Sequence, residues 1–255
     1  MVRTHHAQHY IAAHFKQTCY NTKMTVTTGV VPKHLGLILD GNRRWAREHG
    51  LSVTEGHRQG YANLKNIVRA AQARGVQYVS AYVFSNENWK RERSEVHDLM
   101  KLLMWVLRHE VRQFHHDNIR LRVVGSKLML GKAMVKAIHD AEELTKDNDR
   151  GTLLLCLDYG GQQEIVEATK RIAAAGVKPE AITPELLGQY LYAPDVPPLD
   201  LIIRTSGEQR LSNFMLWEAA YSELLFSKVH WPDFTERHLA NAIARYASRQ
   251  RRFGK

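Results

Sequence analysis

The sequence predicts an α/β fold, in which a single domain is built on a central, mostly parallel sheet of about six strands flanked by helices. From Pro32 onward, short apolar runs alternate with longer segments of helical periodicity. Such alternation is typical of βαβ units, whose strands run parallel. We find no internal repeat and no linker of biased composition, so residues 31–255 are expected to form one domain.

Six apolar segments are expected to be strands. The first, LGLIL at 35–39, runs directly into Asp40. The second, VQYVSAYVF at 76–84, is rich in the β-branched and aromatic residues that favour strands. The remaining strands are expected at 119–125, 152–161, 199–207 and 223–227.

The segments between these strands have helical patterns. Residues 57–74 place apolar side chains on one helical face, and a long helix at 94–116 has a similar stripe. Thr183-Pro184-Glu185 is typical of a helix start, with an N-cap, a proline at the first position and an early acid. The other helices are expected at 131–146, 162–175 and 235–251.

Residues 1–30 are polar and show no sustained period, so we expect a loose N-terminal arm. Its histidines, His5, His6 and His9, leave a metal site there as an alternative. The arm has no apolar h-region of a signal peptide, and no apolar run approaches the roughly 18 residues that span a bilayer. The two cysteines form no spacing pattern, which favours a reducing cytoplasm.

The chain has a formal net charge of +10, which attracts nucleic acid, anionic membrane or phosphorylated small molecules. The sequence contains no zinc-finger spacing, no RNP-type aromatic pair and no Lys-rich tail. We therefore expect no nucleic-acid partner. Phosphorylated substrates become the leading possibility if arginines converge on one site.

Polar residues follow four of the expected strands directly. These segments read DGNRRW at 40–45, SNENWKR at 85–91, YGG at 159–161 and RTSGEQRLSN at 204–213. Parallel strands open at one edge of a sheet, so the four segments should meet there. Arginine forks bind phosphate oxygens bidentately, and glycine turns let backbone N–H groups approach them. The pattern indicates a diphosphate site.

Asp40 is an acid among these cations, and two roles are open for it. A carboxylate could hold Mg²⁺, which takes one or two carboxylates together with substrate phosphates. It could also cap the helix that follows, and spacing does not decide between the two. Two basic clusters suggest two phosphorylated substrates. There is no P-loop, GxGxxG, GxSxG or DDxxD motif in the chain.

Five ordered blocks identify a known family. They are DGNRRW (40–45), GHRQG (56–60), FSNENWKR (84–91), DYGG (158–161) and RTSGEQRLSNFMLW (204–217). Together they resemble the cis-prenyltransferases, the family of undecaprenyl diphosphate synthase-like isoprenyl transferases. The similarity runs from about His34 to Phe253.

The resemblance implies a homodimeric, Mg²⁺-dependent enzyme with a hydrophobic tunnel. It would condense isopentenyl diphosphate onto an allylic diphosphate, usually farnesyl diphosphate, and form a cis double bond at each step. The expected product is the undecaprenyl lipid carrier for cell-wall synthesis, with a short-chain cis-prenyl diphosphate as the alternative. Release of such a product could involve peripheral contact with a membrane.

The resemblance also implies roles for individual residues. It gives catalytic roles to Asp40, His57 and Asn88, and Mg²⁺ binding to Asp40 and to Glu223, the latter near the dimer partner. The substrate-binding residues that it implies are Gly41, Asn42, Arg44 and Trp45 in the cradle for the allylic diphosphate, His57 beside them, Ser85, Asn88, Trp89 and Arg91 on a mobile loop, and Arg204, Arg210 and Ser212 for isopentenyl diphosphate.

Several alternatives stay open at this point. Trp45 and Trp89 could be core or interface residues. The tunnel could be lined by Val83, Leu102, Leu103, Val106 and Leu107, which would serve equally well as ordinary core. Family members often have an arginine where this chain has Val53. A non-catalytic subunit on the same fold would lack the acid and the basic cradle, and this chain has both.

Overall fold

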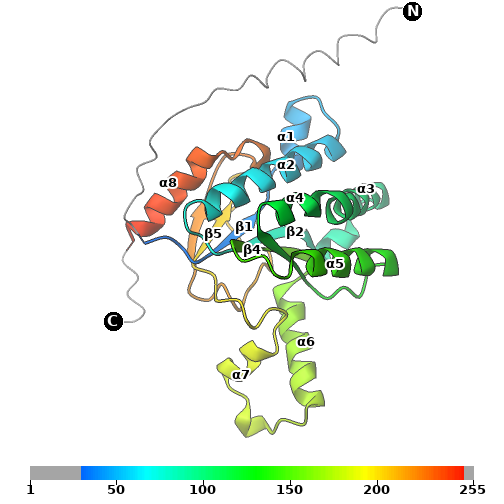
Figure 1. The fold of residues 1–255 in the computed structure, drawn as a ribbon, viewed down its shortest axis with the longest axis vertical. Coiled ribbons are helices and arrows are strands. Elements are labelled where there is room, and N and C mark those ends of the chain that lie inside the picture. Colours follow the sequence, from blue (N-terminus) through cyan, green and yellow to red (C-terminus); the bar gives the residue numbers. More distant parts are fainter. Residues whose placement is uncertain (1–29, 250–255) are drawn as a thin grey trace, which may run out of the picture.

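The structure is a computed structural model that describes residues 30–249 (Figure 1). The expected N-terminal arm, with His5, His6 and His9, lies almost entirely outside these residues and stays a prediction. The predicted helix 235–251 ends earlier than expected, at Ala247 with Ser248 as its C-cap, and its last two predicted residues lie outside the described range.

Six strands form one sheet, in the order β3-β4-β2-β1-β5-β6, and every pairing is parallel. The strands are β1 (His34–Ile38), β2 (Tyr78–Ser85), β3 (Ile119–Val124), β4 (Gly151–Tyr159), β5 (Leu201–Arg204) and β6 (Glu223–Phe226). The predicted fold class is confirmed. The chain first builds outward from β1 to one side and then crosses to β5 on the other, so β1 lies at the switch point where such sheets bind ligands.

The helices are α1 (Asn42–Glu48), α2 (Val53–Gln72), α3 (Arg93–Trp105), α4 (Val111–His116), α5 (Lys132–Thr145), α6 (Gly161–Ala174), α7 (Pro184–Gln189) and α8 (Glu236–Ala247). Side chains from α2, α3, α4, α5 and α8 form the main core with one face of the sheet. Segments 192–199 and 211–219 pack on the other face. Helices α6 and α7 form a lobe that projects from the rest of the molecule (Figure 1).

The structure differs from the sequence prediction in two helices. Helix α2 begins four residues earlier than expected, because the Ser52 hydroxyl caps it by accepting the Glu55 N–H at 3.2 Å. The predicted helix 94–116 is interrupted by a π-helical turn, Val106–Glu110, between α3 and α4. Such turns insert one residue and are frequent at functional sites.

The predicted strand 199–207 also ends early. Strand β5 stops at Arg204, because Ser206 and Gly207 both adopt left-handed backbone conformations, with φ of 71° and 77°. The chain therefore turns away from the sheet directly after Arg204 and can form the loop described below.

Two glycines of the GHRQG block let α1 and α2 approach closely. A Cβ atom on Gly56 would lie 2.4 Å from the backbone oxygen of Asn42. One on Gly60 would lie 2.3 Å from the side-chain oxygen of the same residue. These contacts leave no room for a larger residue, so the glycines fix the position of Asn42 beside the first strand end.

We expect Gly56→Ala to lower the free energy of unfolding by roughly 1–3 kcal/mol, because the added methyl group must displace backbone. The matched control is Gly188→Ala in α7, where the nearest atom to the new Cβ is 3.9 Å away. That change should be neutral or stabilising by about 0.5–1 kcal/mol, since alanine favours helix. Urea denaturation of both variants measures the difference, and equal effects would contradict the packing argument.

Candidate active site

A cavity of about 580 Å³ opens at the carboxyl ends of β1, β2 and β5. One part of it is polar and the other is apolar. The polar lining comprises Asp40, Asn42, His57, Ser85, Glu87, Asn88, Arg91, Arg204, Ser212 and Asn213. The apolar lining includes Leu64, Val83, Leu99, Leu102, Leu103 and Val106. The cavity can therefore take a ligand with an anionic head and a hydrocarbon tail.

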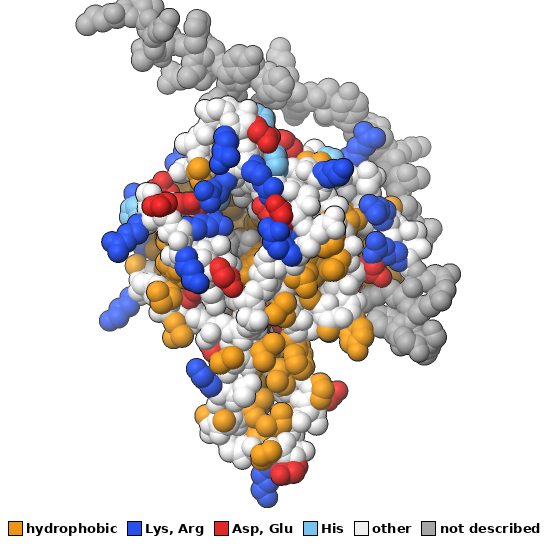
Figure 2. Space-filling model, turned by 180° about the vertical axis from the view of Figure 1, so that it is seen from behind, with side chains coloured by type: hydrophobic (Ala, Val, Ile, Leu, Met, Phe, Trp, Pro, Cys, Tyr) orange, Lys and Arg blue, Asp and Glu red, His pale blue; other side chains and the backbone are white. Residues whose placement is uncertain are grey.

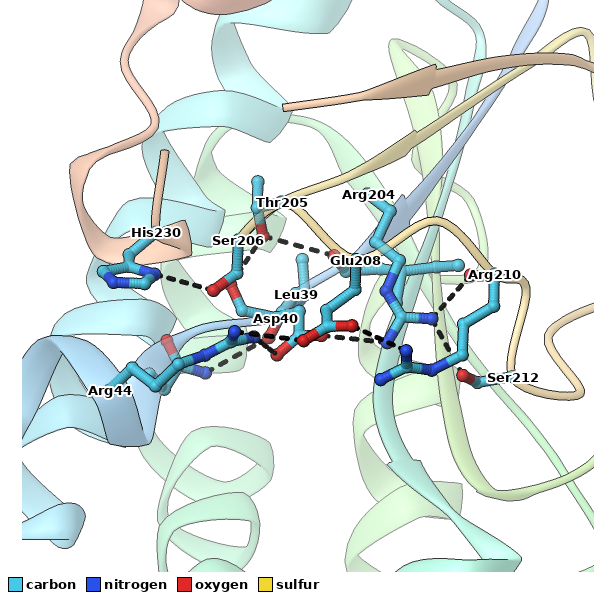
Figure 3. A network of polar contacts seen from close by, with 12 residues as sticks. Leu39, Asp40, Arg44, Arg204, Thr205, Ser206, Glu208, Arg210, Ser212 and His230 are labelled. Atoms are coloured by element: carbon cyan, nitrogen blue, oxygen red, sulfur yellow. Dashed lines mark hydrogen bonds and ion pairs between the residues drawn. The ribbon is translucent and has the colours of Figure 1, made fainter. Parts of the chain in front are cut away.

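The Asp40 carboxylate lies between two guanidinium groups (Figure 3). Arg44 donates to one carboxylate oxygen at 3.0 Å, and Arg204 donates to the other at 2.9 Å. The N-cap of α1 is Gly41, which has φ of 109° and makes no side-chain cap. The helix-cap alternative for Asp40 is thus wrong, since its side chain turns to the arginines instead.

Arg204 is buried, with 5% of its surface exposed, and its guanidinium is fixed by the loop that follows β5. Besides Asp40 it contacts the carbonyl of Arg210 at 2.5 Å and the Ser212 hydroxyl at 2.8 Å. Ser212 and the neighbouring Asn213 have positive φ angles of 50° and 65°. Non-glycine residues in such conformations cluster at functional sites. The predicted isopentenyl diphosphate residues are thus brought together around one guanidinium.

Glu208, which sequence reasoning missed, joins the two basic clusters. It accepts from Arg44 at 3.1 Å and from Arg210 at 2.6 Å. Arg210, and then Arg44, lower the pKa of Glu208 below its usual value. Its place two residues before Arg210 in the RTSGEQR block was the only sequence signal for this role. Arg44 and Arg210 do not line the cavity themselves, but both lie beside Glu208, next to its polar part.

A second missed pair supports the turn after β1. The Ser206 hydroxyl and His230 Nδ1 are 2.7 Å apart, and a Cβ on Gly41 would lie within 3 Å of both groups. The Thr205 hydroxyl donates to the Asp40 carbonyl at 2.6 Å. Gly41 is therefore required for close approach of these segments, while Thr205 fixes the backbone that presents the carboxylate.

The loop after β2 divides its predicted residues between the cavity and the core. A short 3-10 turn, Asn86–Lys90, is held by the Ser85 N–H, which donates to the Asn88 side chain at 3.2 Å. Ser85 and Asn88 line the cavity. Trp89 instead packs edge-on against Phe84, and its Nε1 donates to the buried Asp158 at 2.8 Å. In this structure Trp89 anchors the loop, so its predicted contact with substrate stays untested.

His57 lies at the cavity next to Glu95, another residue that sequence reasoning missed. Glu95 accepts from Arg91 at 3.0 Å, and lies 3.8 Å from His57 Nε2 and 3.6 Å from Arg43. Burial, together with the nearby charge of Arg91, lowers the pKa of His57 to about 4. His57 is therefore neutral at pH 7, and its Nε2 makes no hydrogen bond.

Trp45 and Glu223 also lie apart from the cavity lining. Trp45 stacks on the ring of His49, with ring centroids 4.2 Å apart. Glu223 starts β6 and pairs with Leu201, whereas Phe226 at the other end of the strand pairs with Arg204. Glu223 thus lies at the amino ends of the strands, whereas Asp40 lies at their carboxyl ends. There Glu223 forms an ion pair with Arg249. Within one chain the two predicted metal ligands do not meet.

The apolar part of the cavity follows the predicted tunnel closely. Four of the five proposed residues, Val83, Leu102, Leu103 and Val106, line it. The fifth, Leu107, is buried in the main core. Both residues belong to the π-helical turn, and as consecutive helical residues they face different sides of it.

Comparisons with known proteins agree with this geometry. A family model described as "Putative undecaprenyl diphosphate synthase" matches residues 38–254. The chain belongs to the cis-prenyltransferase family. An isoprenyl transferase 2 of Bradyrhizobium diazoefficiens is 47% identical over 227 residues, covering 88% of this chain and 90% of the relative.

Other proteins similar to this chain have different names. A trans,polycis-polyprenyl diphosphate synthase ((2Z,6E)-farnesyl diphosphate specific) of Thermobifida fusca is 44% identical, covering 88% of this chain and 81% of the relative. Lavandulyl diphosphate synthase from Lavandula x intermedia, solved with dimethylallyl diphosphate, is 36% identical with a TM-score of 0.85, over 88% of this chain and 99% of that one. Relatives of this chain thus make prenyl diphosphates under several names.

The chain is therefore a transferase that carries out cis-prenyl elongation, as its family does. Among residues 30–249, no helix is both long and apolar enough to cross a bilayer. The polar and apolar parts of the cavity match the two ends of a prenyl diphosphate.

We expect stability to fall between pH 6.5 and about 4.5. Burial also lowers the pKa of His34 to about 4, so the native state leaves both buried histidines unprotonated where the unfolded state binds a proton. Each can cost up to about 3 kcal/mol of unfolding free energy as the pH falls through this window. Urea denaturation at several pH values should show a smaller loss in His57→Gln than in the wild type.

His139→Gln is the control for this experiment. His139 is exposed on α5, with 74% of its side chain accessible, so its removal should leave the pH profile of stability unchanged. An acid slope in His57→Gln equal to that of the wild type would show that His57 titrates normally in the folded protein.

Proposed function

We propose that this cis-prenyltransferase condenses isopentenyl diphosphate onto an allylic diphosphate, with farnesyl diphosphate as the expected primer, at the carboxyl ends of β1, β2 and β5. The observation that supports this most directly is the Asp40 carboxylate held between Arg44 and Arg204 at the polar end of a cavity whose other end is apolar. Diphosphate groups need such cations, and prenyl chains need such an apolar space.

The proposed roles follow from position. Asn42 and Arg44, with the turn at Gly41, would hold the allylic diphosphate, while Arg204, Arg210 and Ser212 would hold isopentenyl diphosphate. The allylic C–O bond breaks, and its electron pair leaves with the diphosphate, whose charge the arginines stabilise. The double bond of isopentenyl diphosphate then attacks the allylic carbon, and the adjacent carbon loses a proton. Proximity of the two substrates supplies much of the rate.

The proton acceptor could be a phosphate oxygen, Asp40 or His57. The pKa of His57, lowered to about 4, makes its imidazole a weak base, so its candidacy rests on position: its Nε2 lies at the cavity without a hydrogen-bond partner. Asn88 would contribute through the loop after β2, whose turn it stabilises from the cavity side.

Mg²⁺ is part of the proposal. Within the described chain, no group of three or more His, Cys, Asp or Glu side chains could hold a metal. Mg²⁺ needs only one or two carboxylates when phosphates and waters complete its shell, so Asp40 at the cavity fits such an ion. When bound, the metal would help to neutralise the diphosphate.

We further propose a homodimer. The lobe of α6 and α7 shows a gathering of hydrophobic side chains on one face (Figure 2). Val166 on α6 and Ile182 before α7 are more than two-fifths exposed, and Leu224 is exposed on the edge strand β6. Burial of such a surface favours association. A second copy would also explain why Glu223 lies away from Asp40 in its own chain.

Two product classes fit the family: the undecaprenyl carrier and short-chain diphosphates. Peripheral contact with a membrane belongs to the proposal for a long product, whose tail would have to leave water. A non-catalytic subunit is disfavoured, because the carboxylate and all three predicted arginines of the two basic clusters are in place.

Asp40→Asn should lower kcat by roughly 100-fold or more, because it removes the charge that positions both arginines and would bind the metal. Incorporation of labelled isopentenyl diphosphate with farnesyl or geranyl diphosphate and Mg²⁺ measures this. The control is Asp195→Asn, since Asp195 pairs with Arg122 at 2.7 Å outside the cavity. Near-normal turnover of Asp40→Asn in excess Mg²⁺ would contradict the assignment, and no incorporation by the wild type with any primer would overturn the function.

Mixing two inactive variants tests whether Glu223 acts across a dimer. If Asp40 of one copy works with Glu223 of the other, mixed dimers of Asp40→Asn and Glu223→Gln chains contain one intact site. Co-expression should then restore about a quarter of wild-type activity, since half of the dimers are mixed and each has one working site. No recovery, although both variants are singly inactive and dimeric, would place the two residues in one chain's site or in separate functions.

A further inference from the structure

The apolar part of the cavity lies between two helices that run in the same direction. Residues later in α2 contact residues later in the α3–α4 segment. Thr54 bonds to Asp98 near the start of both, and Arg69 pairs with Asp117 near the end. On α3 the apolar lining extends from Leu99 to Val106, which is roughly 10 Å of helix axis. The apolar space beyond the polar mouth is therefore short.

Tyr61 spans the gap between the two helices at the level of Trp105 and Val106, where the lining on the opposite helix ends, and Leu64 lies almost one turn further along α2. Tyr61 lines the cavity, and its hydroxyl donates to Glu110 in the π-helical turn at 3.3 Å. The Trp105 ring meets it edge-on at a centroid distance of 6.3 Å, and the Lys65 ammonium lies 5.3 Å from its ring centroid. Contacts on several sides thus hold the ring in place.

Beyond Tyr61, pairs of charged side chains fill the space between the two helices. Lys65 forms an ion pair with Glu110, and Arg69 pairs with Asp117 at 2.6 Å. Each pair joins α2 to the helix opposite. A hydrocarbon chain passing this point would have to displace the tyrosine and then separate partly buried ion pairs, which is unfavourable.

The cavity volume indicates how long a chain the space holds. At the packing density of protein interiors, an isoprene unit fills roughly 100 Å³, so 580 Å³ holds about six units at most. Part of that volume lies at the polar mouth, where the diphosphates would sit. The eleven units of an undecaprenyl chain need roughly twice the available space.

We infer that Tyr61 is the stop that limits product length, and that the product is a short-chain cis-prenyl diphosphate of fewer than about six isoprene units. The inference rests on the proposed function and chooses between its two product classes. It assigns to Tyr61 a specificity role outside the five sequence blocks that bind diphosphate.

Product sizing with the full chain tests this. Labelled isopentenyl diphosphate and Mg²⁺ are supplied with dimethylallyl, geranyl or farnesyl diphosphate, and the products are separated by chain length. The wild type should stop below about six units, the limit set by packing. Tyr61→Ala should extend the product by about one unit, because the ring it removes fills about the space of one isoprene unit, and Tyr61→Phe, which keeps the ring, should stay close to the wild type.

Leu99→Ala is the matched control, because it enlarges the same cavity near the mouth rather than at the stop. Lengthening by Leu99→Ala equal to that by Tyr61→Ala would overturn the role of Tyr61. If Tyr61→Ala loses its fold by circular dichroism, Tyr61→Leu replaces it. Undecaprenyl-length product from the wild type would refute this inference while supporting the proposed function, whereas no incorporation at all would refute the function itself.

Discussion

The ion pair between Asp40 and Arg204 is the interaction on which the site depends. Arg204 is almost fully buried, and a guanidinium without a counter-charge at such a position would cost several kcal/mol. The parallel register places Ile38 of β1 opposite Arg204 of β5, so the two strands end at the same level of the sheet. Asp40, two residues further on, then meets the guanidinium at 2.9 Å.

This arrangement needs unusual backbone on both sides. Gly41 turns the chain after Asp40 with a positive φ, and the loop after Arg204 has positive φ angles at Ser206, Ser212 and Asn213. Each non-glycine residue in that region costs on the order of 1 kcal/mol. Hydrogen bonds from the Arg204 guanidinium to the loop offset this cost, so the buried cation organises the loop that it serves.

The sequence could predict that these residues meet, because strand ends are a property of topology. Once β1, β2 and β5 were identified as parallel strands, the residues after them had to meet at one edge. It could not supply contacts that depend on side-chain direction. Trp89 turns into the core towards Asp158, and Glu223 belongs to the wrong end of its strand for a site within one chain.

The carboxylates that sequence reasoning missed show what the cations do before substrate arrives. Arg44 and Arg210 share Glu208, and Arg91 pairs with Glu95, so each arginine already has an anionic partner. Glu208 and Arg210 are largely solvated, and such pairs are worth only about 0–1 kcal/mol. A diphosphate offers more charge and bidentate geometry, so it can replace Glu208 at little cost. The Asp40–Arg204 pair is less exposed, with 26% and 6% of the two side chains accessible, so separating it costs more than separating Glu208 from Arg210.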